Sequence, residues 1–593
     1  MSNAQVSVID AKGGLLGTAS ARSVDGAYSM TLNTRTPTGP LLLQARGVDA
    51  AGLPQVLHSS VAVPAAAMVA NLTPLSDAVV ALAMGTDPRT VFANPLGNSS
   101  ALAGLVNVKA AGEFLKSIIK SQITDLKIAN ATALDLLGDP SFSADKSASD
   151  LLVDSLRVTL GKGNKGEAQL QLANKLAVSL APEVVIDLAV AKTELAKTTG
   201  AVTGAATAIT SSAKATASYS KVLALLGPLD EPVAVLNKMI AQGASAAVFT
   251  ASPALASYTR HDGRVGAELA ALLASYSSKN WQLGRFQITG CADDKPIAGT
   301  CDRVQVAALV SDHSGKVTDL FNDVLAYTAK PAIGATAWGL MGNGKPVLFS
   351  VNPASWLAYQ ADGTLSTNLG GGPATNPSAG VQLRLQAQSS SGSALLASAT
   401  VQTPGGFSIP LAGCGQPLLC LSAKAGATAV EANGGLTDTL LQPADVSWVG
   451  GADTLRNARY LATFSIGGAT DTRSAVMMAE VPTSLPATGR YPALDGVSAT
   501  RPVSWANPGG GQALTWSVWA DDNPGLRMTR LRVVVAQTGQ LTVRDAAVLP
   551  GVMSLSLPAV TLKPNAKVLS AELWLTAQDS AGRLWLTRYA VQP

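Results

Sequence analysis

Charged residues are scarce in this sequence, because Asp, Glu, Lys and Arg make up only 14% of its 593 residues. Soluble domains usually carry about 25%. The formal net charge is +4, and Lys and Arg form no stripe along the chain. The sequence therefore gives no support to nucleic-acid binding. Hydrophobic residues make up 47%, which is enough for several buried cores and excludes global disorder.

Long hydrophobic runs are also missing. The longest ones, such as residues 78–84, fall far short of the ~20 apolar residues that span a bilayer, so the sequence predicts no transmembrane segment. The first ten residues lack the basic and apolar regions of a signal peptide. Two explanations are open: residues 2–4 derive from an expression vector, or this is a mature form whose export signal has been removed.

Motifs of catalysis are absent as well. The chain contains no G-x-S-x-G, no P-loop and no H-E-x-x-H, and it has only three histidines. His58 lies in an expected strand, His261 lies at an expected helix start, and His313 lies in a turn next to Asp312. Each is expected to have a structural or surface role. The sequence predicts no catalytic residue and no cofactor, and it leans away from an enzyme without excluding one.

Two acidic stretches are the candidates for a metal site. Asp521, Asp522 and Asn523 follow one another, and residues 292–294 contain two more aspartates. Neither stretch has the ligand spacing of an EF-hand loop. We therefore predict solvated turns and no bound metal.

The four cysteines form two local pairs, Cys291 with Cys301 and Cys414 with Cys420. Neither pair has C-x-x-C spacing, and the histidines are not arranged around them. Two local disulfides are therefore favoured over metal ligation and over reduced thiols. Disulfides persist in oxidising compartments, so the cysteines place the protein in a periplasm or outside the cell.

Residues 1–66 are expected to form a small β-sandwich, because short alternating runs recur there between turns. One of these expected strands lies within residues 23–32. The pattern V-x-V-x-D-x-x-G followed by D-G-x-Y-x-x-x-L is similar to carboxypeptidase-regulatory-like and CnaB-type modules, which are transthyretin-like sandwiches. The residues that carry this resemblance are Val6, Val8, Asp10, Gly13, Asp25, Gly26, Tyr28 and Leu32.

The resemblance implies one more strand ahead of the first V-x-V, and that strand would lie before Met1. Either the start of the chain was cut, or the gap is filled by a strand from elsewhere. Some CnaB modules carry an intramolecular Lys–Asn isopeptide bond. It is not expected here, because Lys12 lies in a turn and Asn33 lies in the middle of the module.

A helical domain is expected at residues 67–262, where the hydrophobic period changes from two to about 3.6. Thr73 has the properties of an N-cap, Pro74 suits the first helical position, and Gly85 ends this helix. Further helices are expected at residues 147–160, 181–200, 232–249 and 264–276.

An α+β unit is expected at residues 263–367. Its strands end in the pattern W-x-L-x-G-N, at Trp338, Leu340, Gly342 and Asn343. With the preceding helices, this pattern weakly resembles the α+β cone of the nuclear-transport-factor-like superfamily over residues 250–355.

The remaining chain is expected to be all-β, with a small sandwich at residues 381–450 and a larger one at 451–593. With the preceding regions, this predicts a multidomain α+β protein.

Tryptophan offers one candidate ligand site. Trp516 and Trp519 are expected on one strand, where a spacing of three points them to opposite faces. Trp519 and Trp585 are the candidates for stacking on sugar rings, and packing in a core is the favoured alternative.

These features favour an exported bacterial surface or extracellular protein with a structural, adhesive or assembly role. Its partners would be other copies of itself or other surface proteins, and an open sheet edge would allow polymerisation by strand exchange. The alternative is a carbohydrate-binding protein or a cell-envelope enzyme that acts on glycans.

Overall fold

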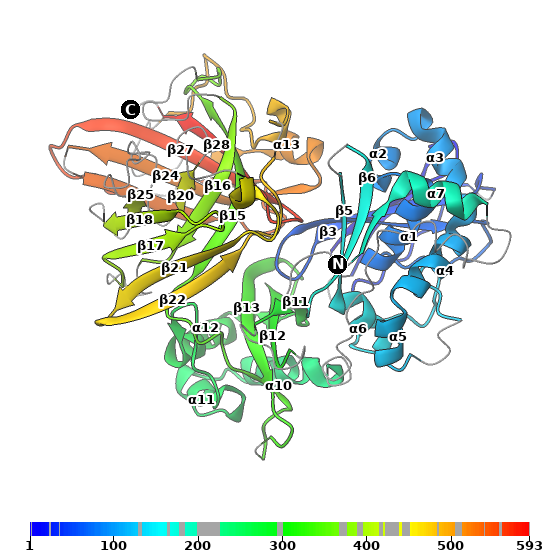
Figure 1. Ribbon diagram of the computed structural model, residues 1–593, viewed down its shortest axis with the longest axis horizontal. Helices are drawn as coiled ribbons and strands as arrows, with labels where there is room; N and C mark the ends of the chain where they lie inside the picture. The colour runs from blue at the N-terminus through cyan, green and yellow to red at the C-terminus, as the bar shows by residue number, and fades with distance from the viewer. Residues whose placement is uncertain are drawn as a thin grey trace. The chain divides into compact units, whose positions relative to one another are not determined.

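The computed structural model (Figure 1) divides into two compact units, Met1–Thr259 with Gly266–Asn343, and Arg260–Val265 with Gly344–Pro593. Together they form a multidomain α+β protein with β-sandwich modules. The structure describes residues 1–593 except 2, 23–24, 35, 129–132, 163–165, 177–183, 198–225, 293–300, 332, 367–375, 388–394, 414–418, 422–437, 442–450, 483–484, 505–512, 539, 557–559 and 592–593.

Unit 1 begins with a four-stranded antiparallel sheet in the order β2-β1-β3-β4. Its alternating runs make strands as expected, and one face buries Val8 and Leu43. The strands are β1 (Gln5–Ile9), β2 (Leu15–Ser20), β3 (Leu41–Val48) and β4 (Pro54–Val61).

An irregular segment covers this face of the sheet, where the sequence predicted a strand within residues 23–32. Tyr28, Met30 and Leu32 pack on the buried face, and residues 25–32 contain no strand. The Tyr28 hydroxyl donates a 2.7 Å hydrogen bond to the carbonyl oxygen of Ala70. The side chains of the segment are thus used to cover the sheet rather than to extend it.

Helix α1 (Pro74–Met84) packs against the opposite face, and its core is continuous with Ile9 and Leu42 of the sheet. It begins and ends where the sequence predicted. The Thr73 side chain accepts from the amide of Ser76, and Gly85 ends the helix with a φ of 73°. Every residue from Leu75 to Met84 is buried, so α1 is the central helix of this region.

Other helices and a small sheet surround α1. The sheet has the order β5-β6-β7. The elements are α2 (Pro88–Ala93), α3 (Ser99–Ala103), α4 (Val108–Ile118), α5 (Lys120–Asp125), α6 (Ala148–Ser155), β5 (Leu156–Lys162), β6 (Ala168–Asn174), β7 (Val184–Asp187) and α7 (Leu188–Ala196).

Two expected helices are therefore partly strand. The helix expected at 147–160 ends at Ser155, and β5 begins at the next residue. Within the range 181–200, residues 184–187 form β7 and the helix α7 begins only at Leu188. Both strands pair with β6, and both contain β-branched residues such as Val158 and Ile186. Pairing in a sheet outweighs the weak helical period of these short segments.

The α+β part of unit 1 follows. Its sheet has the order β10-β12-β13-β14, with β11 also paired to β12. The helix expected at 232–249 is two helices, because the chain turns between α10 and α11. The elements are α10 (Glu231–Ala241), α11 (Ala246–Thr250), α12 (Gly266–Lys279), β10 (Gln282–Leu283), β11 (Gln287–Cys291), β12 (Arg303–Ser311), β13 (Val317–Tyr327) and β14 (Trp338–Leu340).

Unit 2 contains a seven-stranded sheet, β20-β16-β15-β28-β27-β24-β25, and a five-stranded sheet, β19-β18-β17-β21-β22. Their strands are β15 (Phe349–Tyr359), β16 (Ser378–Leu385), β17 (Ser398–Gln402), β18 (Ser408–Gly413), β19 (Leu419–Leu421), β20 (Asp438–Leu441), β21 (Arg459–Ile466), β22 (Ala469–Val476), β24 (Leu526–Gln537), β25 (Gln540–Ala547), β27 (Val568–Asp579) and β28 (Leu584–Ala590). Helix α13 (Ser517–Asp522) and the strand pair β23 (Ala513–Thr515) and β26 (Ser554–Ser556) complete the unit.

The two large sheets share a core, which makes unit 2 a β-sandwich. Leu383 of the seven-stranded sheet and Phe464 of the five-stranded sheet belong to the same buried cluster. Strand pairing also crosses two of the expected domain limits. Val401 pairs with Ala462 across residue 450, and β15 pairs with β28. Pairing between strands distant in sequence leaves no local signal from which a domain limit could be predicted. The five expected domains remain predictions.

A short hairpin of unit 2 is inserted into the sequence of unit 1. It consists of β8 (Arg260–His261) and β9 (Arg264–Val265). Asp262 at its turn forms a 2.8 Å ion pair with Arg473 of β22. The amide of Gly263 donates a 2.9 Å hydrogen bond to the carbonyl oxygen of Lys345. No helix in the part of the chain that the structure describes is long and apolar enough to cross a membrane.

Gly104 lies where the backbone of α1 comes closest, because a Cβ there would be 2.4 Å from the carbonyl oxygen of Ala83. We expect Gly104→Ala to lower the free energy of unfolding by about 1–3 kcal/mol. The control is Gly112→Ala inside α4, where a Cβ meets nothing within 4 Å and should raise stability by up to about 1 kcal/mol. Urea unfolding followed by circular dichroism measures both. Equal effects would contradict the close packing of α1.

Candidate functional site

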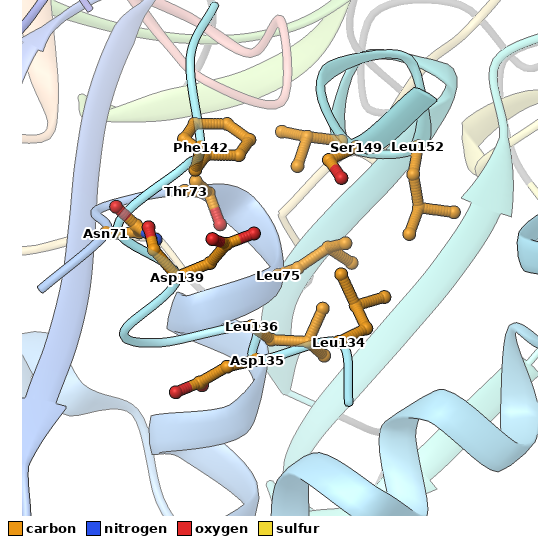
Figure 2. A pocket seen from close by; sticks show the side chains of 11 residues that line it. Asn71, Thr73, Leu75, Leu134, Asp135, Leu136, Asp139, Phe142, Ser149 and Leu152 are labelled. Atoms are coloured by element: carbon orange, nitrogen blue, oxygen red, sulfur yellow. The ribbon is translucent and has the colours of Figure 1, made fainter. Parts of the chain in front are cut away.

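A cavity in unit 1 lies between the segment that precedes α1, the loop at residues 134–142 and helix α6 (Figure 2). The space among its lining residues, open solvent included, is about 310 Å³. The described residues that line it include two carboxylates and no Lys, Arg or His. The apolar lining is Leu75, Leu134, Leu136, Phe142, Leu152 and Val153, and the polar lining is Asn71, Thr73, Asp135, Asp139 and Ser149.

Asp139 is the oriented carboxylate of this cavity. Its Oδ1 accepts hydrogen bonds from the amide and the hydroxyl of Ser141, at 2.8 and 2.6 Å. Asn71 Nδ2 donates to its carbonyl oxygen at 2.9 Å. Figure 2 shows this carboxylate below the ring of Phe142, whereas the side chain of Asp135 points away from the other lining residues. The cavity therefore combines one fixed negative charge, an aromatic ring and apolar walls.

A buried ion cluster lies beside α6 and consists of Lys146, Asp150, Asp154 and Lys175. Lys146 Nζ is 2.9 Å from Asp154 and 3.9 Å from Asp150. Lys175 Nζ is 3.6 Å from the other oxygen of Asp154. Asp154 also accepts from the amide of Ile288 in β11. The cluster thus joins α6, the end of β6 and β11, and removing one member would leave a buried charge unpaired.

Burial and charge pairing act against each other in this cluster. Burial alone would lower the pKa of Lys146, but the carboxylates of Asp154 and Asp150 outweigh it and raise that pKa. Burial raises the pKa of Asp150 despite the nearby Lys146. Burial also lowers the pKa of Lys175. Burial therefore makes the charged forms of Asp150 and Lys175 costly in free energy.

His58 is buried at the junction of β4 and α1, with none of its surface exposed. Its Nδ1 lies 2.7 Å from Asp77 Oδ1, and its Nε2 lies 2.9 Å from the Gln44 amide nitrogen. These distances fit a neutral ring that donates to Asp77 and accepts from Gln44. The structural role expected for this histidine agrees with its position.

The other two histidines lie near aspartates in turns. His261 Nε2 is 3.8 Å from Asp262 in the β8–β9 hairpin. His313 is exposed in the turn between β12 and β13, where Asp312 accepts from the amide and hydroxyl of Ser314. The structure brings neither of them to the cavity or to the ion cluster described above.

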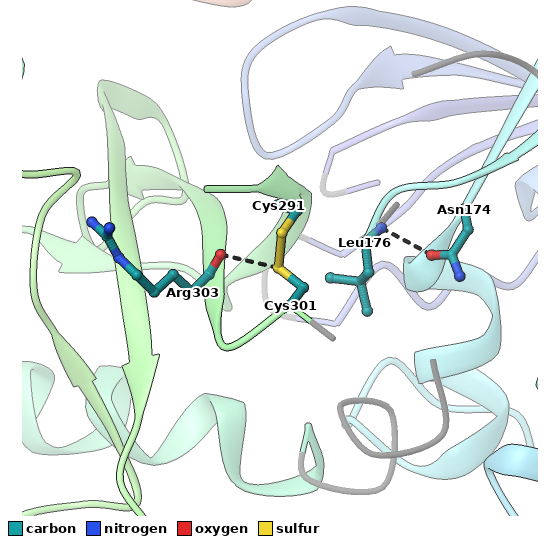
Figure 3. Close-up of a disulfide and its surroundings, with 5 residues drawn as sticks. All are labelled: Asn174, Leu176, Cys291, Cys301 and Arg303. Atoms are coloured by element: carbon teal, nitrogen blue, oxygen red, sulfur yellow. Dashed lines mark hydrogen bonds between the residues drawn. A yellow bond between two sulfur atoms is a disulfide. The ribbon is translucent and has the colours of Figure 1, made fainter. Parts of the chain in front are cut away.

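The disulfide expected between Cys291 and Cys301 is confirmed (Figure 3). Cys291 is the last residue of β11, and Cys301 lies two residues before the start of β12. Their Cα atoms are 5.9 Å apart. Cys301 is fully buried, and its Sγ lies 3.1 Å from the carbonyl oxygen of Arg303. The second expected disulfide lies outside the described residues, because Cys414 and the side chain of Cys420 are not described.

The tryptophans that were candidates for stacking on sugars lie in a core, which is the alternative that the sequence favoured. Trp519 and Trp585 are each 5% exposed. The Trp519 ring nitrogen donates to the carbonyl oxygen of Arg490, and Trp585 meets Tyr491 edge to face at 5.8 Å. Because neither ring presents an open face, stacking on sugars remains a prediction that this packing argues against.

The strand expected around Trp516 and Trp519 is wrong after Thr515, where β23 ends, because residues 517–522 form helix α13. Trp516 is the N-cap of this helix and Trp519 lies within it, and both rings are buried. Asp521 and Asp522 are exposed at the end of this helix, while Asn523 is buried. Among the described residues, no group of acidic, His or Cys side chains has the arrangement of a metal site. Asp293 and Asp294 are outside those residues.

Sequence reasoning missed the cavity and the ion cluster. The cavity loop contains no motif, and its aspartates become neighbours of α6 only through folding. The ion cluster leaves one local signal, because Lys146, Asp150 and Asp154 are spaced by four residues, and this spacing places side chains on one side of a helix.

No protein-family model and no curated protein matches this sequence. One similar solved structure concerns host cell surface retention of a 1.5-MDa bacterial ice-binding adhesin, at 10% identity, with 50% of this chain and 76% of that chain covered and a TM-score of 0.12. Another is a tetra-tandem repeat in the extending region of a large adhesion protein, at 10% identity, 100% and 92% coverage and a TM-score of 0.12. Extracellular domains 3–5 of Drosophila OTK match at 12% identity, 50% and 72% coverage and a TM-score of 0.09. Scores of this size carry no argument about fold or function.

Two aspartates near the start of α6 should respond to acid in opposite ways. The pKa of Asp150 is raised, so its cost to folding disappears as the pH falls from neutral to about 4. For Asp145, burial acts to raise the pKa, but hydrogen bonds from Ser147 outweigh it and the pKa is lowered. The stability contributed by Asp145 is present above its unfolded pKa and is lost as the pH falls through its folded pKa.

Asp150→Asn should therefore lose stability relative to the native protein as the pH falls from 7 to about 4, and Asp145→Asn should gain stability relative to it only below about pH 4. Urea unfolding of the full chain at several pH values between about 7 and 2 measures both differences. Parallel pH profiles for the two variants would contradict the assigned environments.

Proposed function

We propose that this protein is an exported bacterial surface or extracellular protein with a structural or adhesive role. The observation that carries the proposal is the disulfide between Cys291 and Cys301, which links two neighbouring strands in the interior of unit 1. Such bonds persist in the periplasm and outside the cell, and they are rare in the cytosol.

The use of the polar and aromatic side chains supports the same proposal. Side chains of types that often serve in catalysis or ligand binding, such as His58, Lys146 and Trp519, form hydrogen bonds or ion pairs inside the protein. Only 14% of the residues are charged, whereas 47% are hydrophobic, so a large part of the chain can be buried in cores. Such a composition suits a structural protein.

The proposal predicts the compartment and the thiol state. In cells of the source organism, the protein should fractionate outside the cytoplasm, and Cys291 and Cys301 should react with a maleimide only after reduction. Replacing both by Ser should lower the free energy of unfolding by about 2–3 kcal/mol, because the bond closes a short loop. A cytoplasmic protein in which both thiols react without reductant would contradict the proposal, as would clear turnover of polysaccharides or esters by the pure protein.

Self-association through a sheet edge is a further part of the proposal. The outer edge of β4 is occupied, because the amide of His58 donates to Asp77 of α1 at 3.1 Å. In the described part of the chain, the outer edge of β2 receives one backbone bond, from the amide of Asn33 to Leu16 at 2.8 Å, and a side-chain bond from Asn33 to Leu15 at 3.2 Å. We therefore propose β2 as the strand that accepts a partner strand.

Thr18→Pro tests this edge. Ala21 bonds to Ala4 of β1, so by alternation the amide of Thr18 faces away from β1, and proline removes it without breaking the sheet. Light scattering over a concentration series should show assembly of the native protein and of Thr18→Ala, and a monomer for Thr18→Pro. A native protein that is monomeric at every concentration would rule out strand exchange while leaving the structural role intact.

A further inference from the structure

We propose that the cavity around Asp139 and Phe142 binds an organic ammonium, namely an alkyl chain that ends in a primary ammonium group. This inference goes beyond the structural role and is independent of it. It rests on the combination of charge, aromatic surface and apolar wall in one cavity.

The charge comes from a carboxylate that is already oriented. Ser141 holds Oδ1 of Asp139 with two hydrogen bonds, which fixes the plane of the group. Oδ2 receives no hydrogen bond from the described part of the chain, so it can accept from a ligand. Among the described residues, the cavity lining contains no Lys, Arg or His to neutralise this charge. A cationic ligand would supply the missing partner through a charge-assisted hydrogen bond.

The walls fit the rest of such a ligand. Phe142 lines the same cavity as Asp139, so a cation bound in the cavity would have an aromatic ring among its walls. Leu75, Leu136 and Leu152 line the cavity and would contact methylene groups. This is the arrangement expected of a small-molecule site, which has mainly apolar walls and a few oriented polar groups.

Other ligand classes fit less well. An anion would face a carboxylate, and no Lys, Arg or His is among the described residues that line the cavity. A divalent metal ion prefers six or more oxygen ligands for Ca²⁺ or six for Mg²⁺, and six of the eleven described lining residues are apolar. The space among the lining residues is about 310 Å³ when the open solvent at its mouth is counted, so the ligand is small.

The first test compares two probes of equal shape. The full chain is titrated at neutral pH with n-pentylamine and with n-pentanol, and binding is followed by saturation-transfer NMR. We expect n-pentylamine to bind in the millimolar range and n-pentanol to bind about tenfold more weakly or less, because only the amine forms a charged hydrogen bond. Equal binding of the two probes, or no binding of the amine, would overturn the proposal.

Matched variants locate the site. Asp139→Asn keeps an oxygen for Ser141 but removes the charge, and it should weaken n-pentylamine binding about tenfold or more. Phe142→Leu should weaken amine binding while leaving n-pentanol binding little changed. Asp135→Asn is the control, because its carboxylate belongs to the same loop but points away, and it should change binding less than twofold. Circular dichroism confirms that each variant is folded. Unchanged affinity in Asp139→Asn would overturn the assignment.

A second arm identifies the source of the ammonium group. A short peptide with one central lysine is compared with the same peptide acetylated at Nζ. Binding that is tighter than that of n-pentylamine, and that is lost both on acetylation and in Asp139→Asn, assigns a lysine side chain of a partner protein. Binding of n-pentylamine without binding of the peptide assigns a free amine. Failure of both probes overturns the proposal.

Discussion

The arrangement of unit 1 depends on the buried contact between the edge strand β4 and the first turn of α1. Asp77 Oδ1 accepts from both the amide and Nδ1 of His58, and the Ser76 hydroxyl donates to the carbonyl oxygen of His58. Because all of these groups are buried, any slip of the helix along the strand would leave polar atoms without partners. The contact therefore fixes the register between the first sheet and α1, against which α4 and α7 pack in turn.

In the buried ion cluster, charged side chains also need partners inside the protein, as the buried polar groups of His58 and Asp77 do. A protein with few charged residues still places Lys146, Asp150 and Asp154 in its interior. Desolvation makes these groups expensive, and only their mutual pairing makes them tolerable. They therefore act as fixed reference points between α6, β6 and β11, which apolar contacts alone would leave free to shift.

Local signals in the sequence were read well, and signals that arise from folding were not. The ends of α1 follow from Thr73, Pro74 and Gly85, because capping depends only on neighbouring residues. The pairing of Cys291 with Cys301 was predicted for the same reason, because the two residues are close in sequence. The strand β7 and the helix α13 were not predicted, because their states depend on pairing with β6 and on packing in a distant core. Asp139 lay beyond prediction, since nothing local marks a side chain that meets α6 only in three dimensions.

The β8–β9 hairpin imposes an order on folding during synthesis. The ribosome adds Asp262 to the chain long before its partner Arg473, which follows it by 211 residues. At about 5–20 residues per second, this interval lasts on the order of ten to forty seconds. During that time unit 1 can build its own core, while the hairpin waits for a sandwich that does not yet exist. Docking of the hairpin is thus a late event, which must await the synthesis of β22 in the second unit.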